Sequence, residues 1–95
     1  MKRAFIIHGW ASDPEDAWLP WLQRELARRG VAVSATPMPD AETPSIDAWV
    51  AEIARVVGHP DAATYFIGHS IGCQAILRYL ATLQGQHVGG VVCVA

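Results

Sequence analysis

A serine lies between two glycines in residues 68–72, which read Gly-His-Ser-Ile-Gly. An apolar run precedes this stretch and a helical apolar pattern follows it, which is the arrangement of a G-x-S-x-G nucleophile elbow. Because Gly68 and Gly72 lack a Cβ, a strand and a helix can approach closely around Ser70. The pattern therefore predicts a serine nucleophile held at a sharp turn that includes Gly68, His69 and Gly72.

A serine hydroxyl is a weak nucleophile unless a base takes its proton. In proteins with this motif an acid and a histidine follow the serine, yet only residues 71–95 follow it here. His59 and His87 each precede a predicted strand and should lie at the far end of the sheet. His69 is expected to pack or hydrogen-bond at the strand end, and His8 is left as a candidate base at the correct end.

Short apolar runs alternate with helical patterns along the whole chain. Strands are predicted at residues 3–7, 31–36, 64–67 and 88–95, and helices at about 20–29, 44–57 and 71–84. A short helical turn is also expected at Ser12, where Glu15 fits a capping box. This order predicts the α/β fold class, with a parallel sheet of four strands and helices on both faces. A site is expected beyond the carboxyl ends of the strands.

Composition narrows the possible partners. The chain has 95 residues, enough for one domain, is 52% apolar, and carries a formal charge of -2 without a basic stripe, so nucleic acid is not an expected partner. No apolar run approaches the roughly 20 residues that a membrane span needs, and no signal peptide is recognised, so we expect no membrane contact and a cytoplasmic location. No metal or cofactor is predicted. Cys73 and Cys93 are interpreted as small core residues in a reducing compartment, with a disulfide or a reactive thiol as the alternative.

Further motifs accompany the glycine-flanked serine, in a fixed order along nearly the whole chain. They are His-Gly-Trp at 8–10, Trp-Leu-Pro-Trp-Leu at 18–22, Pro-Met-Pro at 37–39, Asp-Ala-Trp at 47–49 and Gly-His-Ser-Ile-Gly-Cys at 68–73. With these motifs the sequence resembles the small serine hydrolases of the α/β-hydrolase superfamily, the family that includes retinoblastoma-binding protein 9 and its bacterial relatives.

The resemblance implies a hydrolase that acts on small-molecule carboxylic esters or related acyl bonds, with Ser70 as the nucleophile. It implies oxyanion donors at the Ile71 N–H and in the loop near Trp10, a loop-shaping role for His8, and the strand order 2-1-3-4. Relatives run to about twice this length and carry their acid and histidine in the additional half. Residues 1–95 are therefore expected to form a single, incomplete α/β-hydrolase domain that is weak or inactive alone.

A second reading concerns the end of the chain. Residues 88–95 would form an open, apolar edge strand, and such an edge invites pairing with another chain. The alternative function is thus a non-catalytic α/β interaction module. It would form a homo-oligomer, or bind a partner chain, through residues 88–95.

Overall fold

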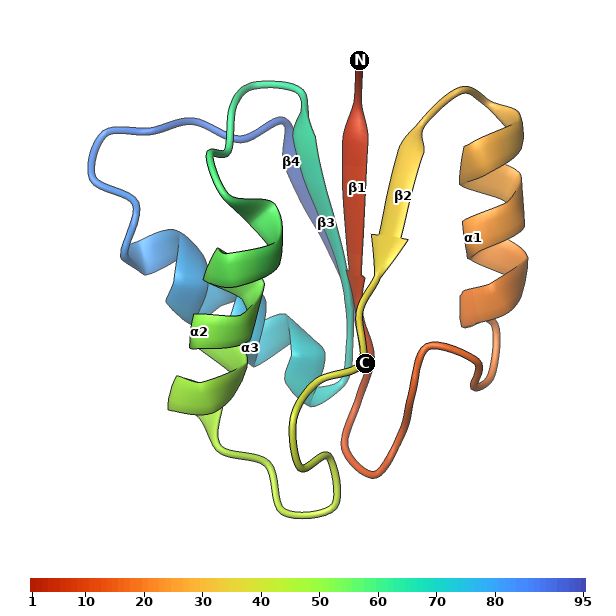
Figure 1. Ribbon diagram of the computed structural model, residues 1–95, viewed down its shortest axis with the longest axis vertical. Helices are drawn as coiled ribbons and strands as arrows, with labels where there is room; N and C mark the ends of the chain where they lie inside the picture. Colours follow the sequence, from red (N-terminus) through yellow and green to blue (C-terminus); the bar gives the residue numbers. More distant parts are fainter.

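The computed structural model describes residues 1–95 and has the alternating strands and helices that the sequence predicts. The strands are β1 (Arg3–Ile7), β2 (Ala32–Ala35), β3 (Thr64–His69) and β4 (Gly90–Val94), and the helices are α1 (Leu19–Arg28), α2 (Ile46–Val57) and α3 (Ile71–Ala81). All neighbouring strands pair in parallel, in the order β2-β1-β3-β4. Helix α1 covers one face of the sheet, and α2 and α3 cover the other (Figure 1). The predicted fold class and strand order are confirmed.

The main core lies between the sheet and the pair α2 and α3. Alternate residues of β3 are buried, and Phe66 stacks on Phe5 of β1 with ring centroids 5.8 Å apart. Helical spacing brings Trp49, Ile53 and Val57 of α2 onto one buried face. This core fixes the positions of the two central strands, β1 and β3, whose carboxyl ends carry the serine turn and the loop beside it.

The predicted helical turn at Ser12 is wrong. The Ser12 hydroxyl donates to the Asp16 carboxylate at 3.0 Å, and the Asp13 N–H donates to the same carboxylate at 3.1 Å. Short polar side chains that bond to nearby groups in this way favour turns over helix. Ala17 then has a φ of 54°, which interrupts any helical path, so α1 begins only at Leu19.

Helix α2 begins two residues later than predicted. Ser45 is the residue that caps it, because its Oγ accepts a hydrogen bond from the Ala48 N–H at 3.3 Å. Thr43 and Pro44 precede this cap and stay outside the helix. None of the three helices combines the length and the hydropathy that a membrane crossing requires.

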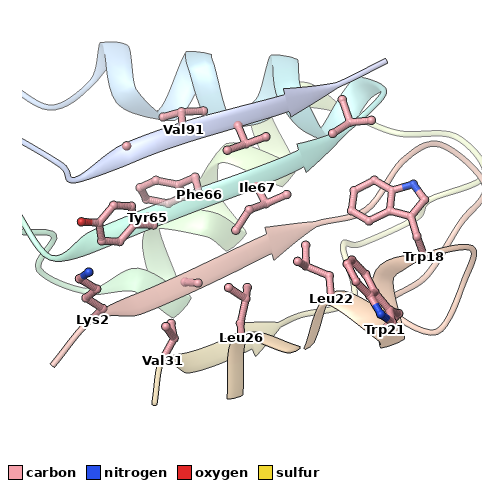
Figure 2. A pocket seen from close by; sticks show the side chains of 14 residues that line it. Lys2, Trp18, Trp21, Leu22, Leu26, Val31, Tyr65, Phe66, Ile67 and Val91 are labelled. Carbon is pink, nitrogen blue, oxygen red and sulfur yellow. The ribbon is translucent and has the colours of Figure 1, made fainter. Parts of the chain in front are cut away.

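One face of the sheet is only partly covered. An apolar groove of about 660 Å³ lies between α1 and the strands β3 and β4, and Figure 2 shows Trp18 and Trp21 on one side of it, with Tyr65 and Ile67 of β3 on the other. Trp21 is 56% exposed, so its ring borders the groove without being enclosed. The groove exists because α1 packs beside β2 at one edge of the sheet and does not reach β4 at the other edge.

Candidate active site

Ser70 occupies a backbone conformation that residues other than glycine rarely adopt. It lies between β3 and α3 with φ 57° and ψ −124°, and it is exposed to solvent. Such conformations cost on the order of 1–3 kcal/mol and persist only where the surrounding structure imposes them. The strand, sharp turn and helix that the sequence predicted are therefore present, with the serine hydroxyl at the carboxyl end of the central strand β3.

Two hydrogen bonds hold the serine turn from opposite directions. The Ser70 N–H donates to the Val94 carbonyl at 2.8 Å, and the Cys73 N–H donates to the Ser70 carbonyl at 3.0 Å. Val94 was missed in the sequence because a backbone carbonyl carries no signal in the side-chain pattern. Only the parallel register of β3 with β4, which pairs His69 with Val94, reveals it.

The two glycines of the turn allow the helix to approach the strands. A Cβ on Gly72 would lie 2.6 Å from the His8 carbonyl oxygen and would also overlap the Ile7 carbonyl. A Cβ on Gly68 would lie 2.9 Å from the Cys73 Cα. Both obstacles are backbone atoms, which cannot move aside cheaply, so the glycines at 68 and 72 are required by packing.

The loop that follows β1 lies directly beside the serine. A Cβ on Gly9 would be 3.2 Å from the Ser70 Cβ. The next residue, Trp10, is 62% exposed, and its indole N–H donates to the Glu42 carbonyl at 2.9 Å. Ile71 is the first residue of α3, so its N–H has no acceptor within the helix. The oxyanion roles of Trp10 and Ile71 stay predictions.

His8 is fully engaged in joining two loops. It is 1% exposed, its Nε2 accepts a hydrogen bond from the Met38 N–H at 2.8 Å, and its Nδ1 lies 2.9 Å from the Gly9 carbonyl. Since an amide N–H only donates and a carbonyl only accepts, these partners fix a neutral ring with its proton on Nδ1. No lone pair is left on His8 to take a proton from Ser70.

The other histidines do not contact the serine hydroxyl either. His69 turns its ring to the α1 side of the sheet, where it meets Trp18 edge to face with centroids 5.4 Å apart. Its Nδ1 is buried without a hydrogen-bond partner. His59 and His87 precede β3 and β4, so they lie at the amino ends of the strands. The hydrogen bonds of the chain include none between Ser70 Oγ and a histidine or carboxylate.

The two cysteines lie close to the turn, and one of them is not a core residue. Cys73 is half-buried in the first turn of α3, whereas Cys93 is exposed on β4. The expectation of a core position for Cys93 is wrong because β4 is the edge strand of the sheet and Cys93 stays exposed there. Burial, followed by the neighbouring Cys93 thiol, raises the pKa of the Cys73 thiol.

Comparison with known proteins identifies relatives along the whole chain. Residues 4–95 match a model of the family described as serine hydrolase. YdeN of Bacillus subtilis (strain 168), a protein whose name assigns it only provisionally as a hydrolase, is 34% identical over 95 residues. The crystal structure of the ydeN gene product from B. subtilis matches with a TM-score of 0.92 at 33% identity, over 98% of this chain. The match covers 50% of the relative in both comparisons, so this chain spans about half of its length.

Proposed function

The chain belongs to the serine hydrolase family, and from this premise we propose that Ser70 is the nucleophile of a hydrolase acting on carboxylic esters or related acyl bonds. One observation carries the proposal. Ser70 is exposed at the end of β3 in a backbone conformation with φ 57°, and two backbone hydrogen bonds, one of them to the distant Val94 carbonyl, hold it there. Backbone strain of this kind is typical of functional sites, where it presents a reacting group at a fixed position.

The proposed reaction forms an acyl-enzyme. Ser70 Oγ attacks the acyl carbon, the bond to the leaving alcohol breaks, and water later releases the acid. The charge that develops on the acyl oxygen needs preorganised donors. The Ile71 N–H, at the start of α3, and a backbone N–H near Trp10 are the donors that we propose. The chemistry requires no cofactor.

The proton of Ser70 must leave to a base that these 95 residues do not place beside it. Both nitrogens of His8 are engaged, and His69 contacts Trp18. We therefore propose that this chain contributes the nucleophile and the oxyanion donors, while acid and histidine come from polypeptide corresponding to the rest of the longer relative. Loss of triad members leaves a residual acceleration of about 10³–10⁴ over water in well-built proteases, so weak activity is expected from the chain alone. A cytoplasmic location stays a prediction.

Labelling with a fluorophosphonate probe tests this proposal. The 95-residue chain is compared with a version that continues after Ala95 with the additional half of YdeN. We expect strong labelling of the extended version, weak labelling of the chain alone, and none in either after Ser70→Ala. Ser34→Ala, in β2, is the matched control and should label normally. If the extended version is folded by circular dichroism and Ser70 does not react, the hydrolase proposal fails.

A second candidate function rests on the uncovered side of the sheet. Val92 on the edge strand β4 is 55% exposed, and the apolar groove of Figure 2 continues from β4 onto β3. These features support a non-catalytic module that self-associates, or binds a partner chain, through residues 88–95. Light scattering at micromolar concentration should then report oligomers. A clean monomer would contradict self-association, and ester turnover that Ser70→Ala abolishes would contradict a non-catalytic role.

A further inference from the structure

The two cysteines lie on the same face of the sheet, next to each other. Cys93 pairs in register with Gly68 of β3, and residues paired across parallel strands project to the same face. On that face, the place of a Gly68 side chain is taken by α3, since a Cβ there would lie 2.9 Å from the Cys73 Cα. Cys73 therefore stands directly above the sheet neighbour of Cys93, with no side chain of Gly68 between them.

The spacing suits a covalent link. Neighbouring strands lie about 4.8 Å apart within the sheet, and α3 lies above the sheet at Gly68, at right angles to that spacing. Combined, the two displacements separate the Cα atoms of Cys73 and Cys93 by roughly 6 Å, within the 4.4–6.8 Å that disulfides span. Consistent with this placement, the Cys73 Sγ lies 3.5 Å from the carbonyl of Val94, the residue that follows Cys93. Neither α3 nor β4 would have to move far for the two sulfurs to join.

The two thiols differ in access. Cys93 is exposed, so it meets a dissolved oxidant first. Cys73 is half-buried, and burial followed by the Cys93 thiol raises its pKa, which disfavours Cys73 as the first site of oxidation. Cys93 is thus suited to react with the oxidant first, and Cys73 to attack the oxidised Cys93 sulfur afterwards.

We propose that Cys73 and Cys93 are a modification site that forms a reversible intramolecular disulfide with a two-electron oxidant such as hydrogen peroxide. The Cys93 thiolate attacks a peroxide oxygen and the O–O bond breaks, which forms a sulfenic acid on Cys93. The hydroxide that departs takes up the proton lost from the Cys93 thiol and becomes the first water. Cys73 then attacks the Cys93 sulfur, the S–O bond breaks, and the hydroxide that departs takes the Cys73 proton as water. Two thiols are oxidised and one peroxide is reduced to two waters.

The disulfide would act on the serine turn through β4. The Val94 carbonyl accepts a hydrogen bond from the Ser70 N–H at 2.8 Å, and the Cys73 thiol contacts the same carbonyl. A bond from Cys73 to Cys93 ties α3 to β4 next to this carbonyl, so the oxidised chain keeps β4 seated against the turn. The regulatory consequence rests on the proposed function of Ser70, whereas formation of the disulfide does not.

Mass spectrometry of the 95-residue chain after graded peroxide tests the site. Trypsin cleavage after Arg78 separates the two cysteines into different peptides. We expect both thiols to disappear together, with a loss of about 2 Da, a cross-linked peptide pair and reversal by dithiothreitol. The thermal midpoint of the oxidised chain should rise by roughly 10 °C, because the link closes a loop in the unfolded state. Cys93→Ser and Cys73→Ser should show neither effect.

Two outcomes would overturn the proposal. One is a Cys93-to-Cys93 dimer, and the other is irreversible oxidation of Cys93 while Cys73 keeps its free thiol. A separate arm measures fluorophosphonate labelling of the oxidised and reduced extended version. Labelling that fails in both states while the disulfide still forms would reject the proposed function and leave the disulfide standing. Labelling that is equal in both states would reject the regulatory consequence alone.

Discussion

Replacing Ser70 with glycine is expected to make the chain more stable while removing the proposed nucleophile. Ser70 has a φ of 57° and is exposed, so its side chain contributes strain and little buried contact. Glycine adopts positive φ without a steric cost because it has no Cβ. The substitution therefore relieves the backbone of the turn and leaves its hydrogen bonds to Val94 and Cys73 in place.

The size of the effect follows from two opposing contributions. Strain of this kind costs on the order of 1–3 kcal/mol in the folded state. Glycine makes the unfolded chain more flexible, which costs about 0.5–1 kcal/mol on folding. Taking the middle of each range, the net expectation is a gain of about 1 kcal/mol, which raises the thermal midpoint by roughly 4–8 °C in a domain of this size.

Urea unfolding followed by circular dichroism measures this difference, with Ser70→Ala as the matched control. Alanine also removes the hydroxyl but keeps the Cβ, so it keeps the strain. We expect the urea midpoint to be higher for Ser70→Gly than for Ser70→Ala, with equal slopes. If the glycine variant is no more stable than the alanine variant, the turn is not strained and the physical argument for Ser70 is refuted.

Three further substitutions test the surroundings of the turn. Gly72→Ala should lower the free energy of unfolding by about 1–3 kcal/mol, because its Cβ would lie 2.6 Å from the His8 carbonyl oxygen. Gly90→Ala is the control, since the nearest neighbour of its Cβ would be 3.4 Å away. Equal urea midpoints for the two variants would contradict the packing argument. His8→Phe keeps an aromatic ring but leaves the buried Met38 N–H without its acceptor, so a loss of about 1–3 kcal/mol is expected in the same assay, and an unchanged midpoint would count against it. Hydrogen bonds from a backbone N–H and then from a threonine hydroxyl lower the pKa of Asp61, so its stabilising effect is present above the unfolded pKa of about 4 and is lost as the pH falls through the folded value. Asp61→Asn should flatten the acid limb of a plot of urea midpoint against pH, and parallel plots for the two proteins would show that this carboxylate does not contribute.

The fold could be predicted because its signals are local and periodic. Apolar runs and helical spacing located the strands and helices, and the Gly-x-Ser-x-Gly pattern located the sharp turn at Ser70. The errors arose where side chains compete with the backbone. After Ser12 the carboxylate of Asp13 accepts the Glu15 N–H, the donor that a capping box would have directed to the Ser12 hydroxyl, and no periodicity reveals that competition.

Features of the site that depend on distant segments could not be predicted in the same way. The Val94 carbonyl reaches Ser70 only through the register of two parallel strands, and the exposure of Cys93 depends on what packs against an edge. His8 could be predicted only in part. Its position at the end of β1 follows from the sequence pattern, but its hydrogen bond with the Met38 N–H depends on how two loops meet in the folded chain.

The bond between the Ser70 N–H and the Val94 carbonyl also makes the serine amide a reporter. This amide is shielded from hydrogen exchange as long as β4 stays paired beside β3, because its acceptor belongs to the edge strand. Its exchange rate with deuterated water therefore measures the free energy with which β4 detaches, read at the residue where the proposed chemistry takes place. An inhibitor, an oxidant or an added polypeptide that seats the edge strand more firmly will slow the exchange of that one amide, whether or not a substrate has been identified.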